Sequence, residues 1–228
     1  MKKTIGILAG MGPRSTAPFL ELVIDECQRQ YGARNDNDFP KMMIYSLPTP
    51  FYVDKPINHK AMKETIIEGL QKLEKTGVDF IAMPCNFAHI YFEDLEKSIN
   101  VPLLNIVDET VKELPTNSER TTLFSTSFTY EFGIYQKGIK NYKHEFVFNN
   151  EWQVILNNLI KSIKENKDDE KNVETLKKLI KEVEEEDIQN IIIGCTDLNP
   201  VLKKTEVPIN IVDSSKCLAE AVIKRYLS

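Results

Sequence analysis

Short runs of apolar residues alternate along the chain with longer stretches of helical periodicity. The apolar runs predict strands at residues 4–9, 42–46, 80–83, 122–125, 145–148 and 190–193. The amphipathic stretches predict helices at residues 17–31, 59–76, 152–166 and 172–185. Strands joined by helical crossovers of about a dozen residues or more are typical of parallel sheets. The pattern therefore predicts an α/β fold.

The chain also contains an internal repeat, in which a buried strand leads into a cysteine. The first copy, residues 77–86, ends in MPCN and is followed by VPLLNIVD at 101–108. The second copy, residues 187–196, ends in IGCT and is followed by VPINIVD at 207–213. In each copy a polar residue, Asn86 or Thr196, follows the cysteine and can cap the next helix. The repeat predicts two similar Rossmann-like domains with mainly parallel sheets, related by a pseudo-two-fold axis, whose cysteines face an active site in the interdomain cleft.

Composition narrows the class of protein. The 228 residues are 42% hydrophobic and 28% charged, with a net charge of −5, as expected for a globular chain with a sizeable core. No apolar run approaches the roughly 18 residues of a membrane span, and the N-terminal run is too short and too rich in glycine for a signal peptide. The acidic balance argues against a nucleic-acid partner. We expect a cytoplasmic protein that binds neither membranes nor nucleic acid.

The four cysteines differ in their sequence context. They lie far apart without a CxxC motif, so we expect neither a metal site nor disulfides. Cys85 and Cys195 follow predicted strands, and ligands of open α/β sheets bind beyond the carboxyl ends of strands. A thiol at a helix N-terminus has a lowered pKa, which makes a thiolate available for base or nucleophile chemistry. Cys27 and Cys217 lie within helical patterns, and we expect them to serve packing.

Two further features lie beside the predicted strand ends. The turn AGMGPRS at residues 9–15 has Ser15 where a dinucleotide fingerprint needs its third glycine, and no phosphate-loop lysine follows. The turn is therefore either a plain strand-to-helix connection or a site where free N–H groups bind a carboxylate. His89 follows Cys85 by about one helical turn and could tune its thiolate, although helical histidines more often bond to neighbouring groups.

Together these motifs resemble the PLP-independent aspartate/glutamate racemase superfamily, and within it the aspartate racemases, over essentially the whole chain. IGILAGMGP at 5–13 resembles the family's opening strand and turn, MPCNFAH at 83–89 its first cysteine motif, and IGCTD at 193–197 its second. The resemblance implies an isomerase without cofactors that interconverts L- and D-aspartate, with Cys85 and Cys195 as the acid/base pair on opposite faces of the substrate Cα. It also implies an N-terminal domain of residues 1–104 plus 210–228 and a second domain of residues 105–209. We further expect a homodimer.

The resemblance implies a set of substrate contacts around the two cysteines. These are Met11, Gly12, Thr49, Lys55, Asn86, Phe87, Thr126, Ser127, Thr129, Lys164 and Thr196. Lys164 matches a family lysine near the distal carboxylate of the substrate. Three departures from the family pattern affect side-chain specificity. Phe87 stands where threonine is usual, Phe128 replaces a small turn residue, and Asp54-Lys55 can replace the usual Asp-Arg pair only with a two-residue insertion. Lysine does not reproduce the bidentate grip of arginine.

Other functions stay open at this point. The same fold hosts glutamate and hydantoin racemases and a decarboxylase that uses one cysteine. The presence of both Cys85 and Cys195 argues against the decarboxylase, and the opening turn argues against the hydantoin branch. Glutamate remains an alternative substrate. A non-catalytic amino-acid-binding protein of two domains would explain the duplication, but it would leave the matched cysteines without a purpose.

Overall fold

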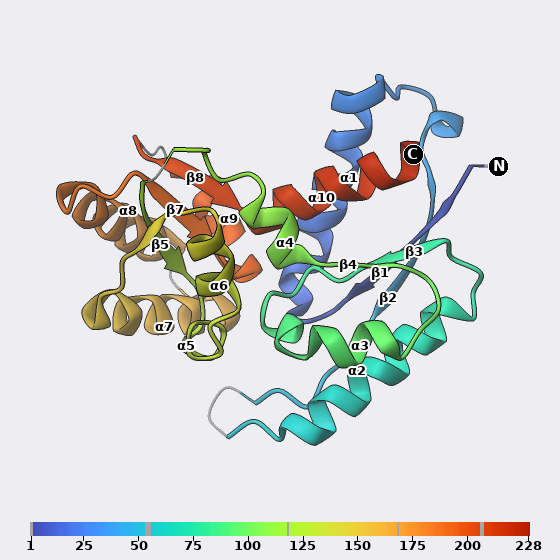
Figure 1. Ribbon diagram of the computed structural model, residues 1–228, viewed down its shortest axis with the longest axis horizontal. Coiled ribbons are helices and arrows are strands. Elements are labelled where there is room, and N and C mark those ends of the chain that lie inside the picture. Colours follow the sequence, from blue (N-terminus) through green and yellow to red (C-terminus); the bar gives the residue numbers. More distant parts are fainter. Residues whose placement is uncertain (1, 53–55, 118, 168, 206–207) are drawn as a thin grey trace. The chain divides into compact units, whose positions relative to one another are not determined.

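The computed structural model describes residues 2–52, 56–117, 119–167, 169–205 and 208–228. The chain divides into two compact units, the first formed by Met1–Ile106 and Ser215–Ser228 and the second by Val107–Ser214. Over the described residues, each unit contains one sheet of four strands, and every pairing is parallel (Figure 1). The α/β fold with two parallel sheets is thereby confirmed.

The sheet of the first unit has the strand order β2-β1-β3-β4. Its strands are β1 (Thr4–Ala9), β2 (Lys41–Ser46), β3 (Phe80–Ala82) and β4 (Leu103–Leu104). The helices of this unit are η1 (Pro13–Ser15), α1 (Thr16–Tyr31), η2 (Asp36–Asp38), α2 (His59–Glu74), η3 (Phe87–Tyr91), α3 (Phe92–Lys97) and α10 (Ser214–Leu227). Helix α4 (Ile106–Val111) spans the point where the chain passes from the first unit to the second.

Helix α2 covers part of the first sheet because its apolar residues repeat at helical spacing. Met62, Ile66, Leu70 and Leu73 are buried in one cluster with residues of β1 and β3. The helix begins after Asn58, whose side chain accepts a hydrogen bond from the Ala61 N–H at 3.0 Å. The other face of α2 is polar and exposed.

The C-terminal helix α10 belongs to the first unit, where it lies beside α1 (Figure 1). The Gln30 side-chain amide donates to the Glu220 carbonyl at 3.1 Å, and the Arg29 guanidinium is 3.2 Å from the Glu220 carboxylate. The rings of Tyr31 and Tyr226 lie 6.2 Å apart. The end of the chain therefore completes the unit that its beginning forms.

The sheet of the second unit has the strand order β6-β5-β7-β8. Its strands are β5 (Arg120–Phe124), β6 (Glu145–Phe146), β7 (Asn190–Ile193) and β8 (Asn210–Asp213). The helices are α5 (Ser127–Glu131), α6 (Ile134–Asn141), α7 (Asn150–Lys164), α8 (Asp169–Glu185), η4 (Thr196–Leu198) and α9 (Asn199–Leu202).

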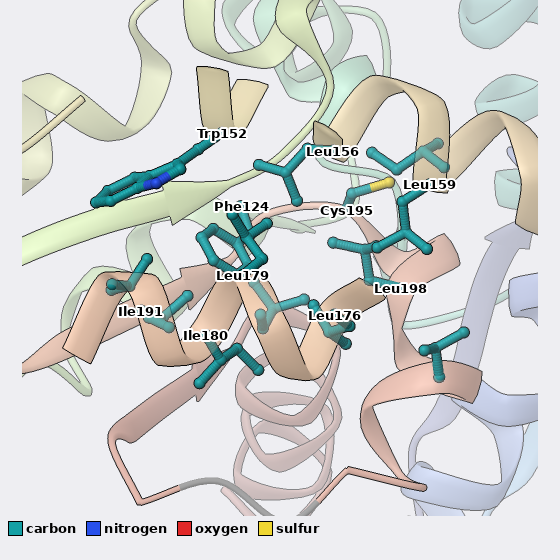
Figure 2. Packing of buried hydrophobic residues seen from close by; sticks show 14 of the residues in the cluster. Phe124, Trp152, Leu156, Leu159, Leu176, Leu179, Ile180, Ile191, Cys195 and Leu198 are labelled. Carbon is teal, nitrogen blue, oxygen red and sulfur yellow. The ribbon is translucent and has the colours of Figure 1, made fainter. Parts of the chain in front are cut away.

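Helices α7 and α8 supply most of the apolar core of the second unit. Leu156 of α7 and Leu176 and Leu179 of α8 pack with Phe124 of β5 and Ile191 of β7 (Figure 2). Both helices are strongly amphipathic, with charged residues on their outer faces, as the Lys- and Glu-rich sequence indicates.

The pattern of apolar runs does not predict β4 and β8. Strand β4 has only two residues, and β8 begins with Asn210 and ends with Asp213, so that its apolar part is also two residues long. Both are edge strands, each of which pairs with a neighbour on one side only.

Over the described residues, no helix combines the length and the apolar character that crossing a membrane requires.

Candidate active site

The turn after β1 requires a glycine. Gly10 has φ +93°, and a Cβ at this position would lie 2.6 Å from the backbone nitrogen of Leu47, which follows β2. Leu47 in turn donates its N–H to the Ala9 carbonyl at 2.9 Å. Met11 and Gly12 follow, and the Gly12 carbonyl accepts the Ser15 hydroxyl at 2.7 Å. The chain thus leaves β1 close against the end of β2 before α1 begins.

Cys85 lies just beyond β3, at the same end of the sheet. Its N–H donates to the Met83 carbonyl at 2.8 Å, and its side chain is buried in one cluster with Met11 and Phe87. Asn86, which is also buried, precedes η3 and accepts the His89 N–H through its carbonyl at 3.0 Å. Because the carboxyl ends of parallel strands share one edge, this edge of the first unit gathers a thiol, an amide side chain and a glycine turn.

His89 supports the backbone at Cys85. Its Nδ1 lies 2.8 Å from the Cys85 carbonyl oxygen, and the Ile106 N–H donates to its Nε2 at 3.2 Å. Since Nε2 accepts, Nδ1 carries the proton and donates it to the carbonyl. Burial lowers the pKa of His89 to about 4, so the ring is neutral near pH 7. In this arrangement His89 fixes the loop that carries the thiol, and both of its ring nitrogens are used by backbone groups.

The burial of His89 predicts a pH dependence of stability. Its folded-state pKa of about 4 lies below the ordinary value of 6.5, so protonation favours the unfolded chain. The contribution of the neutral ring to the free energy of unfolding is complete above pH 6.5. As the pH falls from 6.5 to 4 it is lost, so the free energy of unfolding declines by about 3 kcal/mol. Urea unfolding at a series of pH values should show a smaller decline over this range in His89→Gln than in the wild type. The exposed His59, changed to Gln, serves as the control, and equal declines in all three proteins would contradict the assignment.

Cys195 occupies the corresponding position beyond β7 in the second unit. Strands β5 and β7 pair as far as Phe124 and Ile193, and the Gly194 N–H donates to the Phe124 carbonyl at 2.9 Å. Cys195 directly precedes η4, and its buried side chain lies near Leu159 and Leu198 (Figure 2). The cysteine that follows the strand therefore recurs in both units.

The residues after β5 form a polar turn at the same edge as Cys195. Thr126 caps α5, since its hydroxyl accepts the Thr129 N–H at 3.3 Å and lies 3.1 Å from the Thr129 hydroxyl. Ser127 shares a hydrogen bond with Asn157 of α7, with 2.7 Å between the Asn157 Nδ2 and the Ser127 Oγ. The buried Gln153, one turn before Asn157, donates to the Ser125 carbonyl at 3.0 Å. Neither α7 amide was among the predicted site residues, although their spacing of four residues was the available signal.

Lys164 and Asp197 form an ion pair beside Cys195. The Lys164 Nζ lies 2.6 Å from Asp197 Oδ2, and the same oxygen lies 3.9 Å from the Cys195 Sγ. The carboxylate is nearly inaccessible, with 7% of its side chain exposed, whereas 24% of the lysine side chain is exposed. Asp197 was not among the predicted site residues, although it belongs to the second cysteine motif.

The expected substrate contacts thus fall into two groups, one in each unit. Those that follow the carboxyl ends of β1 to β3 are Met11, Gly12, Thr49, Cys85, Asn86 and Phe87. Those that lie around the ends of β5 and β7 are Thr126, Ser127, Thr129, Lys164, Cys195 and Thr196. Lys55 lies outside the described residues. Within the described ranges, no group of three or more His, Cys, Asp or Glu side chains could hold a metal ion.

Residues 8–222 match the Asp/Glu/hydantoin racemase family, and the chain belongs to this family. It is an isomerase, an amino-acid racemase. The broad specificity amino-acid racemase RacX of Bacillus subtilis (strain 168) is 49% identical over 225 residues, which cover 98% of each chain. The aspartate racemase of Picrophilus torridus superposes with a TM-score of 0.82 at 29% identity, covering 98% of this chain and 94% of that one. An aspartate racemase homologue from Pyrococcus horikoshii OT3 superposes with a TM-score of 0.79 at 28% identity over the full length of both chains.

Proposed function

We propose that the protein racemises amino acids, aspartate among them, by proton transfer between Cys85 and Cys195. The observation that carries this proposal is the recurrence, in both units, of a buried cysteine followed by a polar residue beyond a parallel strand. In this reaction a thiolate takes the Cα proton, and a thiol on the opposite face gives a proton to the planar carbanion. Inversion results because the two protons are handled on opposite faces. The two thiols then titrate as a coupled pair, one ionised and one neutral.

Polar groups at the two strand ends are suited to hold the α-carboxylate. Negative charge moves onto this carboxylate as the Cα proton leaves, and fixed donors that receive such charge make a large contribution to catalysis. Asn86, Thr126 and Thr196 each carry a side-chain donor two to four residues after the end of a strand, and Thr126 is held in place by its bond to Thr129. We propose that these residues bind the α-carboxylate and the α-amino group.

The positive charge of Lys164 favours a substrate with a distal carboxylate, such as aspartate, but it does not restrict the enzyme to aspartate. The Lys164 ammonium, 2.6 Å from Asp197 Oδ2 at the edge that carries Cys195, has the charge opposite to that of a distal carboxylate. As a compact charge on a flexible stem, lysine discriminates side-chain length less than the arginine fork that the family pattern usually has. The 49% identical relative is named for its broad specificity, which agrees with this arrangement. We therefore propose activity on aspartate together with other amino acids, glutamate included.

Exchange of the Cα hydrogen tests the proposed reaction. We expect that the enzyme, incubated in D2O with L-aspartate or D-aspartate, will replace the Cα hydrogen of either enantiomer and form the other one, as followed by NMR and chiral chromatography. A non-catalytic amino-acid-binding protein would give no exchange, and a decarboxylase would release carbon dioxide. Either result would contradict the proposal.

The same assay on Lys164→Met tests the distal contact. The ratio of kcat/KM for aspartate to kcat/KM for alanine is expected to fall about tenfold or more, which corresponds to about 1.4 kcal/mol. Comparing two substrates removes any effect of the substitution on the thiols, because that effect is common to both. Lys161→Met, which changes an exposed lysine of the same helix, should leave the ratio unchanged. An unchanged ratio in Lys164→Met would show that the distal carboxylate is held elsewhere.

We also propose that the protein forms a homodimer. Strand β2 lies at the edge of the first sheet and exposes 41% of Met43 and 45% of Ile44. An edge strand with exposed apolar residues is suited to pairing with another chain. Sedimentation equilibrium should give twice the mass of one chain, and the mass of a single chain would contradict the proposal.

A further inference from the structure

The two units differ at one position of the repeated motif. The residue two places after Cys85 is Phe87, whose ring centroid lies 6.2 Å from those of Phe51 and Tyr91. The residue two places after Cys195 is Asp197, a buried carboxylate. The repeat therefore places the two thiols in matched backbone positions but gives them different neighbours, an aromatic ring in one unit and a charge in the other.

The geometry at Cys195 favours the protonated thiol. Its Sγ lies 3.9 Å from Asp197 Oδ2, within reach of a weak S–H···O hydrogen bond in which the thiol donates. A thiolate in the same place would have no proton to donate and would face the negative carboxylate. A nearby like charge disfavours ionisation, and the effect is stronger where burial reduces the screening by water.

Lys164 pairs with the oxygen of Asp197 that accepts from the Cys195 thiol. The ammonium lies 2.6 Å from Asp197 Oδ2, the oxygen that also faces the sulfur. Of the other charged groups on α7, Glu151 and Lys161 are exposed. On the side of α9, the carboxylate of Asp213 at the end of β8 accepts the Asn199 amide at 3.0 Å. Among the contacts that the described residues make, Asp197 with Lys164 is therefore the charged pair that lies beside the sulfur.

We propose that Asp197, held by Lys164, keeps Cys195 as the protonated thiol in the resting enzyme, so that Cys195 starts as the proton donor and Cys85 as the base. Asp197 is a positioning residue in this scheme, because it acts through Cys195. The protonation of Cys195 follows from the described contacts of the second unit, whereas its catalytic meaning rests on the proposed function.

The steady-state rates of racemisation alone do not test this difference between the thiols. The equilibrium constant between two enantiomers is one, so kcat/KM must be equal in both directions at every pH. The difference in protonation between Cys85 and Cys195 has to be measured on the thiols themselves. The rate of alkylation by iodoacetamide measures it, since the thiolate is the reactive form and the rate follows the thiolate fraction. The modified peptides, separated by mass spectrometry, give separate rates for Cys85 and Cys195.

Two substitutions should change the alkylation of Cys195 in opposite directions. In Asp197→Asn the like charge is removed and Lys164 remains, so the rate at pH 7 should rise about fivefold or more. In Lys164→Met the carboxylate loses its counter-ion beside the sulfur, and the rate should fall by a similar factor. Asp197→Glu keeps the charge and should remain within twofold of the wild type. The rate at Cys85 serves as the internal control and should change less than twofold in all three variants.

The outcomes distinguish this proposal from a purely structural role of Asp197, and they can be interpreted whether or not the proposed function is correct. Changes of the same direction in Asp197→Asn and Lys164→Met, equal changes at both cysteines, or no change at Cys195 would each overturn it. Should Asp197→Asn fail to fold, Lys164→Met still decides, because its partly exposed side chain is removed without deleting the buried acceptor. The assay uses the full chain without substrate, so a failed racemisation assay would leave its result intact.

Discussion

Changing either Cys85 or Cys195 to alanine is expected to lower kcat for racemisation by about a thousandfold or more while the protein remains folded. A positioned general acid or base contributes roughly 10²- to 10⁴-fold, and inversion needs one on each face of Cα. A thousandfold loss corresponds to about 4 kcal/mol of transition-state stabilisation. Chiral chromatography of the products gives the rate, and circular dichroism with thermal unfolding establishes the fold.

The chain provides matched controls for this experiment. Cys27 and Cys217 are also buried cysteines, but they lie within the helices α1 and α10 rather than in the loops that follow β3 and β7. Their alanine variants make the same chemical change and should keep kcat within a few-fold of the wild type. Near wild-type racemisation by either Cys85→Ala or Cys195→Ala would show that the reaction does not use two cysteine bases.

The strands that the sequence predicted best are those whose apolar runs are buried on both faces. The predicted bounds of β1 and β7 agree with the structure, because Thr4–Ala9 and Asn190–Ile193 form inner strands with neighbours on both sides. The outer strands β4, β6 and β8 were predicted less well, since one exposed edge relaxes the demand for apolar residues. Thus β8, with Asn210 and Asp213 at its ends, was missed, and β6 ends at Phe146 rather than at the predicted residue 148.

Parts of the candidate site depend on neighbours far away in the sequence, and these were not predictable. The repeated motif indicated Cys85 and Cys195 as candidate site residues because strand, cysteine and polar residue lie close together in the sequence. The pairing of Lys164 with Asp197 joins α7 to η4, and no local pattern selects these two among the many lysines and acidic residues. His89 was recognised as a neighbour of Cys85, but its neutral state follows from burial and from its bond to Ile106, which only the fold supplies.

Serine variants of the two cysteines are expected to separate exchange from inversion. With one thiol left, the remaining thiolate can remove the Cα proton, exchange it with solvent and return deuterium on the same face. Cys85→Ser and Cys195→Ser should therefore each deuterate one enantiomer of aspartate, opposite to that of the other variant, while inversion falls by about a thousandfold or more. NMR in D2O measures the exchange, and chiral chromatography of the same samples measures the inversion.

The opposite choice of enantiomer is the decisive part of this result, because it assigns one thiol to each face of Cα. The double variant, Cys85→Ser with Cys195→Ser, is the control and should show neither exchange nor inversion above the background without enzyme. If both single variants deuterated the same enantiomer, one base would serve both faces, and the second cysteine would need another role. If a single variant still inverted the substrate at a rate near that of its exchange, the proton would come from water or a third group. Either finding would exclude the two-thiol mechanism, whereas opposite enantiomers would establish which cysteine faces the Cα hydrogen of L-aspartate.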